Sequence, residues 1–393
     1  MTSDVVSLLA ELVAINSVNA SMPGGPGEAE LAQRVAAYGR DLGASVTLEE
    51  VLPGRPNVTL TLPGPPEGPA RRLDRPRRLL FDVHLDTVPI EGMSEPLSAR
   101  ISRGKMWGRG TCDTKGSLAA TLIALRRLAA HPGPRRHEIA LLCTVDEEYL
   151  KRGVMHVVRQ GLSASAAIVG EPTNLRPVVA HKGAVRWRLI THGRAAHTSR
   201  PESGNNAVYQ MVEVIEELRE RLEPALAQGQ HPLLSPPTLT VGRIEGGVGV
   251  NIVPERCVIE IDRRTLPQED PEAILAEIDA MMADLMRRRE GLRVEREAPF
   301  LSERGLETAP DSAVVQALQA ACREVLGEDS AVEPEGVPYG TDATHLQGIP
   351  TVVFGPGDIA QAHTADEWVD LAQVEAGAEI TYRLMRSFAA GDW

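Results

Sequence analysis

Two kinds of hydrophobic spacing divide the chain. Before residue 180, short apolar runs such as LLFDVHL, IALLCTV and AAIVGE alternate with segments of helical spacing, among them 27–43 and 115–130. Short apolar runs that alternate with helices are typical of buried strands in a mostly parallel sheet. This part therefore predicts an α/β domain with a doubly wound, mostly parallel sheet.

The pattern changes near residue 180. Strand-like alternation and amphipathic helical spacing then follow one another in the segments 184–191, 205–225, 238–245, 256–263, 271–289 and 292–298. Their order, β-α-β-β-α-β, is that of a ferredoxin-like α+β unit. The α/β pattern resumes afterwards with a helix at 311–326, the strand TVVF and a helix near 371–388.

The spacing thus predicts one α/β domain that is interrupted by an insert. We assign residues 1–179 to the first part of this domain, 180–298 to the inserted domain and 299–393 to the second part. A chain of 393 residues exceeds what one hydrophobic core usually spans, which agrees with two domains.

Composition narrows the functional classes. The chain is 42% hydrophobic and 24% charged, as in an ordinary soluble globular protein, and its formal net charge of -13 disfavours nucleic acid or an anionic membrane as a partner. No apolar run reaches the ~18 residues of a membrane span. The start, MTSDVVSLLAELVAI, has no basic flank and predicts an amphipathic helix instead of a signal peptide. The scattered cysteines form no Cys-x-x-Cys pair, so we expect a reduced, cytoplasmic compartment.

Residues with metal-binding side chains stand at the ends of separate segments. They are His84, Asp113, Glu148, Glu171 and His363. Most follow an apolar strand, and open α/β sheets place their sites at the carboxyl ends of strands. The set is too large for one catalytic zinc, which usually takes three protein ligands and a water, but it suits two metals that share a carboxylate. Two divalent cations, three carboxylates and a hydroxide are together neutral, whereas a single cation leaves negative charge that is costly in a dry cleft. The pattern predicts a metallohydrolase.

Taken singly, each motif also has a structural interpretation. A histidine at a strand end, such as His84, is more often structural, and Asp113 can be no more than a helix N-cap. Asp146, Glu147 and Glu148 can form an acidic turn in water. If the chain stays extended there, neighbouring Glu147 and Glu148 point in different directions, so one can bind metal while the other handles protons.

Asp86 lies two residues after His84, on the same face of an extended segment. A metal-bound imidazole needs its second ring nitrogen held, usually by a carboxylate or a carbonyl. Asp86 can do this directly or through the local backbone.

At these residues the chain closely resembles the two-zinc amidohydrolase and peptidase family of acetylornithine deacetylase, succinyl-diaminopimelate desuccinylase, aminoacylase and glutamate carboxypeptidase. The matching motifs run from about residue 80 to 375 and are HLDTV, GRGTCDTKG, DEE, GEPTNLRPVVAHKG, GRAAHTSRPESGNNAV, NIVPERCVIEIDRRTLP, GTDATHL and GPGDIAQAHTADEWV. Two of them, GEPTNLRPVVAHKG and VVFGPGDIAQAH, look most like acetylornithine deacetylase. GTDATHL is closer to carboxypeptidase and aminoacylase members, and GTCDTKG has cysteine where alanine is more usual.

The resemblance implies a distribution of the ligands over two metals. His84 and Glu171 are expected to hold one zinc, Glu148 and His363 the other, and Asp113 to bridge them. Co²⁺ and Mn²⁺ are alternatives to Zn²⁺.

The resemblance also implies the roles of neighbouring groups. Glu147 is expected to be the general base, which takes a proton from a metal-bridging water and later passes it to the leaving amine. Asp86 is expected to support His84, and the peptide bond between Asp113 and Thr114 is expected to be cis.

By the same resemblance the insert is a lid and dimerisation domain. His197, in GRAAHTS, matches a histidine that reaches the neighbouring subunit's active site and stabilises the tetrahedral oxyanion. Asn251 and Arg264 match residues that bind the carboxylate end of the substrate, although Arg264 can equally be a surface residue of its strand. Gly340 and Thr341 match backbone that contacts substrate.

The expected function is that of a cytoplasmic, homodimeric, zinc-dependent amidohydrolase that removes an N-acyl group from an amino acid, as acetylornithine deacetylase does. Alternatives within the class are succinyl-diaminopimelate, an N-acyl-glutamate or a dipeptide as the substrate. A single-zinc aminopeptidase would not need the insert with its GRAAHTS and DRRTLP motifs. A non-catalytic binding module should have lost ligands or the base, and all of them are present.

Overall fold

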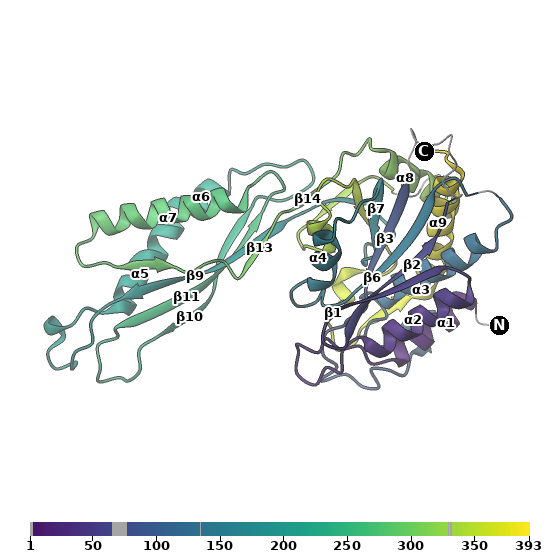
Figure 1. The fold of residues 1–393 in the computed structure, drawn as a ribbon. Coiled ribbons are helices and arrows are strands. Elements are labelled where there is room, and N and C mark those ends of the chain that lie inside the picture. Colours follow the sequence, from purple (N-terminus) through teal and green to yellow (C-terminus); the bar gives the residue numbers. More distant parts are fainter. Residues whose placement is uncertain (1–2, 65–76, 134, 329, 331) are drawn as a thin grey trace. The chain divides into compact units, whose positions relative to one another are not determined.

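The apolar runs of the sequence form the central strands of a large mixed sheet in a computed structural model, which describes residues 3–64, 77–133, 135–328, 330 and 332–393. Its strands follow the order β1-β2-β6-β3-β7-β16-β8-β14, with β15 beside β8 (Figure 1). Their bounds are β1 Ser45–Leu52, β2 Arg55–Leu62, β3 Arg78–His84, β6 Glu138–Thr144, β7 Ala166–Val169, β8 Val178–His181, β14 Leu306–Glu307, β15 Glu335–Val337 and β16 Thr351–Val353.

The centre of this sheet is parallel and its sides are antiparallel. Strand β3 runs parallel to β6 and β7, and β16 runs parallel to β7. The β1–β2, β2–β6, β16–β8 and β14–β8 pairs are antiparallel. The predicted α/β fold is confirmed, and its parallel part lies where the near-continuous apolar runs are.

Helices cover the sheet through one hydrophobic core. They are α1 (Asp4–Ala14), α2 (Ala29–Asp41), α3 (Lys115–Ala129), α8 (Ala313–Leu326) and α9 (Leu371–Ala390). Leu79, Phe81 and Val83 of β3 belong to this core. Because successive side chains of a strand point to opposite faces, Asp82 and His84 project away from it. This alternation delivers His84, at the end of β3, to the other side of the sheet.

Contacts between Cα atoms divide the chain into two units. Unit 1 comprises Met1–Val179, Thr308–Glu335 and Thr341–Trp393, and unit 2 comprises Ala180–Glu307 and Gly336–Gly340. The sequence analysis placed the insert at 180–298, so unit 2 continues some residues beyond the predicted insert and includes one further short segment.

Unit 2 has the predicted β-α-β-β-α-β order. Its elements are β9 (Gly183–His192), α5 (Ala207–Glu217), α6 (Glu223–Leu226), β10 (Thr238–Gly246), β11 (Arg256–Thr265), α7 (Pro271–Arg288), β12 (Val294–Arg296) and β13 (Leu301–Glu303). The strand order β10-β11-β9-β12, with antiparallel neighbours, is that of a ferredoxin-like sheet, and β13 also pairs with β9. The predicted helix at 205–225 is divided by a π-helical turn at Leu218–Leu222.

Several short elements of unit 1 escaped the sequence analysis. Strands β4 (Arg100–Ser102), β5 (Lys105–Trp107) and β17 (Trp368–Asp370) form a small separate sheet. The helix α4 (Arg152–Arg159) follows the acidic turn after β6, and the 3₁₀ turns η3 (Asp342–His345) and η4 (Ile359–Gln361) lie in the last part of the chain. Strands of three residues are too short to show a period in the sequence. Among the described residues, no helix is long and apolar enough to cross a membrane.

Candidate metal centre

Three neighbouring parallel strands deliver most of the predicted ligands to one edge of the sheet. His84 ends β3, Glu148 follows β6, and Glu171 follows β7, while β3 pairs in parallel with both other strands. Asp113 comes just before α3, and His363 comes just after the 3₁₀ turn η4. Carboxyl ends of parallel strands meet at the same edge, which explains why residues far apart in the sequence converge here.

Asp113 lies between the two histidines. Its Oδ1 is 3.0 Å from Nε2 of His84, and its Oδ2 is 3.4 Å from Nε2 of His363. Glu171 Oε1 lies 3.8 Å from the same nitrogen of His84, and Glu148 Oε2 lies 3.0 Å from that of His363. The two carboxylate oxygens of Asp113 therefore face two separate His–Glu pairs, which is the arrangement that a bridging ligand between two cations requires. The peptide bond between Asp113 and Thr114 is cis, as expected.

The contacts of His84 turn its Nε2 toward the predicted carboxylate ligands. Its Nδ1 lies 2.9 Å from the backbone carbonyl of Asp86. Because a carbonyl oxygen only accepts, Nδ1 carries a proton, so Nε2 is the nitrogen that can bind a metal once it gives up its own proton to do so. The Asp86 carboxylate is 3.8 Å from Nδ1, so it is the backbone of Asp86 that holds the imidazole.

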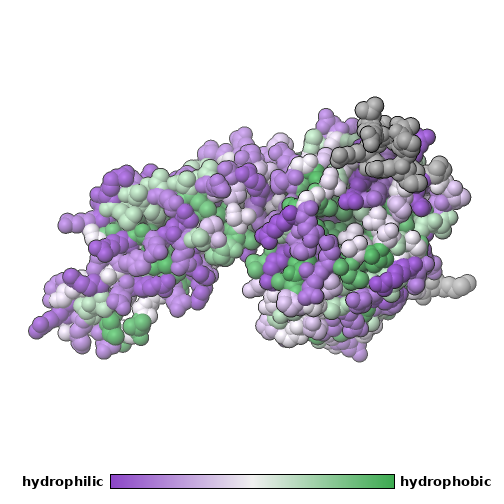
Figure 2. Space-filling view, in the orientation of Figure 1, coloured by the Kyte–Doolittle hydropathy of each residue, from purple (hydrophilic) through white to green (hydrophobic). Residues whose placement is uncertain are grey.

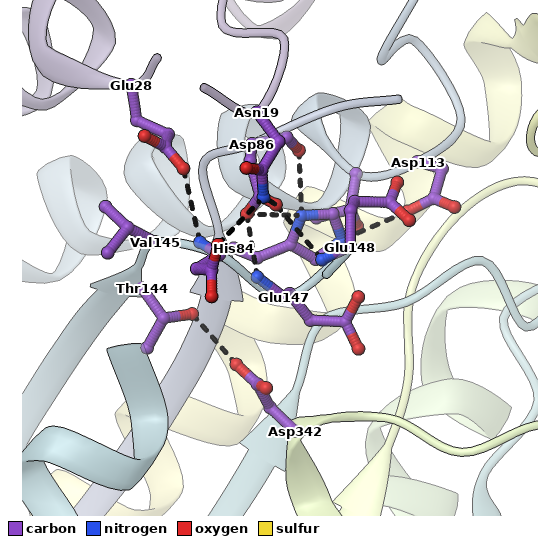
Figure 3. Close-up of polar contacts among 12 residues, drawn as sticks. Asn19, Glu28, His84, Asp86, Asp113, Thr144, Val145, Glu147, Glu148 and Asp342 are labelled. Carbon is purple, nitrogen blue, oxygen red and sulfur yellow. Dashed lines mark hydrogen bonds and ion pairs between the residues drawn. The ribbon is translucent and has the colours of Figure 1, made fainter. Parts of the chain in front are cut away.

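The Asp86 carboxylate instead holds the acidic turn (Figure 3). Its Oδ1 accepts a hydrogen bond from the backbone N–H of Glu147, and its Oδ2 accepts one from that of Glu148, both at 3.0 Å. Asn19 Nδ2 donates to the same Oδ2 at 2.8 Å. Burial raises the pKa of Asp86 to about 6. Asp86 thus fixes the positions of the predicted base and one predicted ligand.

A second buried layer fixes Asp146, the first residue of the acidic turn, which has a left-handed φ of 72°. Its carboxylate accepts hydrogen bonds from Asn19 at 3.1 Å, Arg55 at 3.0 Å and Arg152 at 2.5 Å. Glu28 in turn accepts from Arg55 at 2.7 Å. The sequence analysis named Asp146 only as part of the acidic turn, and it missed Asn19, Glu28 and Arg55, which lie far from it in the chain and stand in no motif recognised there.

Glu147 lies beside the His84 and Glu171 pair. One oxygen of each carboxylate and one nitrogen of His84 all lie within 4.8 Å of one another. Lys151 Nζ is 3.2 Å from Oε1 of Glu147, whose residue is 9% exposed. A carboxylate in this place can exchange protons with a reacting group or add a ligand to the metal.

The electrostatics of the cluster favour cations. Hydrogen bonds to Asp113 and Glu148 raise the pKa of His363 to about 10, and burial raises that of Glu148 to about 8. Burial, joined by the charge of Asp113, raises the pKa of Glu171 well above its ordinary value. Burial disfavours the charged form of His84, but Asp113 and Glu171 outweigh it and raise its pKa. Such a crowd of buried carboxylates is stabilised by bound positive charge, so the residues present fit a pair of metal ions.

A further acidic pair below the site was also missed. Thr144 Oγ1 lies 3.0 Å from Oδ2 of Asp342 (Figure 3), and it lies 3.2 Å from Oδ1 of Asp82. A hydroxyl has only one proton to donate, so one of the two carboxyls must contribute the proton of the second hydrogen bond. Burial raises the pKa of both acids, that of Asp82 to about 7. This pair ties η3 to the strands that carry the ligands.

The remaining predicted residues mostly lie in unit 2. His197 and Asn251 are exposed and lie on adjacent segments, because Thr198 N donates to the carbonyl of Asn251 at 3.2 Å. Arg264 lies 3.0 Å from Asp262, the residue two positions earlier in β11.

Gly340 ends the short segment of unit 2 that precedes η3. Thr341 belongs to unit 1, where its hydroxyl caps η3 by accepting from the N–H of Ala343 at 3.2 Å. The structure therefore brings together the predicted metal ligands, Asp86 and Glu147 within unit 1.

Comparisons with known proteins agree with the motifs. Residues 80–387 match the model of Peptidase family M20/M25/M40. The acetylornithine deacetylase of Proteus mirabilis is 32% identical over 324 residues, which cover 80% of each chain. That of Aliivibrio fischeri is 31% identical over 369 residues, which cover 91% of each chain.

Solved structures share the fold. The aminopeptidase PepT of Bacillus cereus has a TM-score of 0.76 at 24% identity and covers 98% of both chains. The Bacillus subtilis YXEP protein, described as a dinuclear metal binding peptidase, has a TM-score of 0.71 at 15% identity, over 98% of this chain and 97% of its own.

Proposed function

The chain belongs to peptidase family M20/M25/M40 and is a hydrolase of amide or peptide bonds, and from this premise we propose that it removes an N-acyl group from an amino acid. The substrate class is supported by the names of several curated relatives, which are acetylornithine deacetylases at 30–32% identity over most of the chain. N-acetylornithine is therefore the first substrate to test.

The observation that carries the proposal is the position of Asp113 between two His–Glu pairs. His84 and Glu171 would hold one divalent cation, Glu148 and His363 the other, and Asp113 would bridge them. When bound, such a pair of cations polarises the amide carbonyl and makes water more acidic. Nitrogen and oxygen ligands suit Zn²⁺, with Co²⁺ and Mn²⁺ as alternatives.

We propose that Glu147 is the general base. Its carboxylate lies next to His84 and Glu171, within reach of a water that attacks a carbonyl there. It would take a proton from this water and deliver it to the leaving amine. Asp86 contributes by accepting a hydrogen bond from the backbone N–H of Glu147, which fixes the main chain from which the base extends.

His197 is proposed to stabilise the oxyanion in the active site of a neighbouring subunit. The backbone N–H of Ser199 lies 3.1 Å from Nδ1 of His197 and donates to it. Because this nitrogen accepts, the neutral ring carries its proton on Nε2, which is then a donor for an oxyanion. The exposure of His197 agrees with a partner outside its own unit.

A homodimer is the assembly that this role requires, and unit 2 offers a surface for it. Among the described residues, β10 pairs only with β11 and leaves its other edge open. Val248 and Val250, in the loop after β10, are 89% and 99% exposed. Hydrophobic side chains that reach the surface of unit 2 appear green among purple polar ones in Figure 2. An open edge with exposed apolar residues is suited to another copy of the same chain.

Recognition of the substrate's carboxylate is proposed for Arg264 and Asn251. A guanidinium binds a carboxylate through paired hydrogen bonds, and Arg264 would exchange its contact with Asp262 for the substrate. Gly340 and Thr341 would contribute backbone contacts at the start of η3.

The test is a set of initial hydrolysis rates with the zinc-loaded protein. The substrates are N-acetylornithine, other N-acetyl amino acids, N-succinyl-diaminopimelate, N-acyl-glutamates and dipeptides. We expect one N-acetyl amino acid to be preferred, with activity removed by a chelator and restored by zinc. Preference for a succinyl substrate or a dipeptide would reassign the substrate. Silence across the set with two metals bound would refute the proposed removal of an N-acyl group from an amino acid.

A further inference from the structure

Glu367 is a buried carboxylate that neither the predicted ligand set nor the proposed chemistry uses. It lies four residues after His363, immediately before β17, and is 1% exposed. Its Oε1 accepts hydrogen bonds from the backbone N–H of Cys112 at 2.8 Å and from that of Asp113 at 3.1 Å. Its Oε2 accepts from the N–H of Gly110 at 3.0 Å. One carboxylate therefore holds three backbone donors of the loop that ends in the predicted bridging residue.

The same loop is tied to Glu367 by the backbone and by an ion pair. Gly108 N donates to the carbonyl of Glu367 at 3.1 Å. Arg109 Nη1 donates to Oε2 at 2.8 Å, and its Nε donates to the carbonyl of Pro89 at 3.0 Å. Arg109 thus neutralises the buried carboxylate, and each carboxylate oxygen has two donors. A buried charge that is fully paired in this way holds a single geometry, because any shift leaves a donor or acceptor unsatisfied.

The loop has no room to adjust by itself. Gly108 has a φ of 148°, and a Cβ added there would lie 2.8 Å from the carbonyl oxygen of Pro96. The next residue, Arg109, donates its N–H to that same carbonyl at 2.8 Å. The position of Asp113 at the end of this loop is therefore set by Glu367 and by Pro96, both distant in sequence.

These contacts connect the loop that ends in Asp113 to the segment that carries His363. Asp113 must place one oxygen toward His84 and the other toward His363, at 3.0 Å and 3.4 Å in this structure. Glu367 binds the backbone of Asp113 and belongs to the same short segment as His363. We propose that Glu367 is a positioning residue, which keeps Asp113 in register with His363 so that one carboxylate can serve two metal ions. This inference rests on the proposed two-metal site.

The substitution Glu367→Gln tests it, with Glu375→Gln as the matched control on the exposed face of α9. A glutamine has the same length but turns an N–H₂ group toward backbone donors, so it cannot hold the loop as the carboxylate does. Metal-free wild type and variants are titrated with Co²⁺ and followed by absorbance, together with calorimetry using Zn²⁺. Thermal unfolding in a chelator reports folding of the metal-free protein.

We expect wild type and E375Q to bind two ions. In E367Q the first ion should still bind, while the dissociation constant of the second rises by ~10–100-fold, the usual effect of losing a partner that orients a metal ligand. If the role of Glu367 is purely structural, the substitution should lower the unfolding temperature without weakening the binding of the second ion more than that of the first. Two wild-type affinities in folded E367Q, or equal weakening of both steps, would overturn the proposal.

If loss of the charge opposite Arg109 prevents E367Q from folding, the variant Glu367→Asp provides the test of the proposal. This variant keeps the charge for Arg109 but is too short to reach every backbone donor, so a selective loss of the second ion is again expected. Wild-type affinities in E367D, or failure of both variants to fold, would overturn the positioning role. If wild type itself binds only one ion, it is the proposed two-metal function that fails.

Discussion

The predicted site residues of unit 1 and of unit 2 differ in how they are held. In unit 1 the predicted ligands other than the exposed His363 are buried or half-buried, and Asp86 fixes the acidic turn through two backbone N–H groups. In unit 2, His197 and Asn251 are exposed, and Arg264 contacts only the neighbouring Asp262 among the ion pairs of the described residues. The chemistry is thus built on groups with few alternative positions, whereas substrate recognition is expected from groups that can still move. Removal of metal should therefore affect unit 1, whereas substitutions in unit 2 should affect the binding of substrate.

Removal of the metals should have the largest effect and should act on one unit. A chelator is expected to abolish hydrolysis and to lower the stability of unit 1, since a ligand present at a thousand times its Kd stabilises the native state by about 4 kcal/mol. Hydrogen exchange with and without zinc measures this. Amides of β3 and α3 should lose protection, while those of β10 and α7 should not change. Equal loss in both units would contradict the comparison.

Substitution of Glu147 and of His197 should separate chemistry from metal binding in each unit. Glu147→Ala is expected to lower kcat by ~10²-fold or more, because the water loses its proton acceptor. His197→Ala should also remove most activity, because the oxyanion loses a donor. Metal analysis should find both metals in each variant.

Mixed dimers provide the control for the role of His197. A dimer with one Glu147→Ala subunit and one His197→Ala subunit contains one site with both groups intact, so mixing should restore activity. If mixing restores none, the assignment of His197 to the neighbouring subunit is wrong.

Substitution of Arg264 should change binding with little effect on the chemical step. Arg264→Leu removes a charge-assisted hydrogen bond, which contributes about 1.5–3 kcal/mol, so KM is expected to rise by ~10–100-fold while kcat stays within a few-fold. Arg188→Leu is the matched control, because Arg188 lies on the same face of the unit 2 sheet and pairs with Glu260. Steady-state kinetics on the preferred substrate distinguish the two. Equal effects of both substitutions would mean that Arg264 acts only through the general surface charge and does not bind the substrate.

The smallest expected effect is a release of protons on metal binding. Asp113 and Glu148 raise the pKa of His363 to about 10, so without metal its imidazole is protonated at pH 8. A metal ligand must be neutral imidazole, and the proton has to leave. Affinity should therefore rise with pH, by ~10-fold per pH unit for each proton, up to about the raised pKa. Calorimetry at pH 8 in two buffers of different ionisation heat counts the protons, and none released would contradict the hydrogen-bonded state of His363.

The sequence predicted the longer elements, which the structure confirms, and a set of candidate metal ligands, which the structure brings close together. The apolar runs at 79–83 and 139–143 became β3 and β6 because burial of alternating or continuous apolar residues is a local property of a strand. His84, Glu148 and Glu171 could be singled out as candidate ligands because each stands at the end of such a run or just after it. Their family resemblance was likewise carried by contiguous motifs, and the match over 80–387 confirms it.

The sequence did not predict how these groups are held. Strand β17 has only three residues, and its pairing with β5 depends on segments more than 250 positions apart. Asn19 and Asp86 are 67 residues apart, and Glu367 and Asp113 are 254 residues apart. A hydrogen bond between residues so far apart produces no periodic pattern in the sequence. Asn19 and Glu367 therefore cannot be distinguished there from ordinary polar residues.

By itself, the sequence determined which segments are buried and which side chains capable of binding metal end those segments. Both follow from the order of residue types along a few neighbouring positions. The tertiary structure alone decided that Asp113 turns one oxygen to His84 and the other to His363, and that the Asp86 carboxylate holds the acidic turn instead of the imidazole. Hydrophobic burial tolerates many partners, whereas a hydrogen bond requires one donor and one acceptor at a set distance and angle. Those partners exist only after distant segments have packed together.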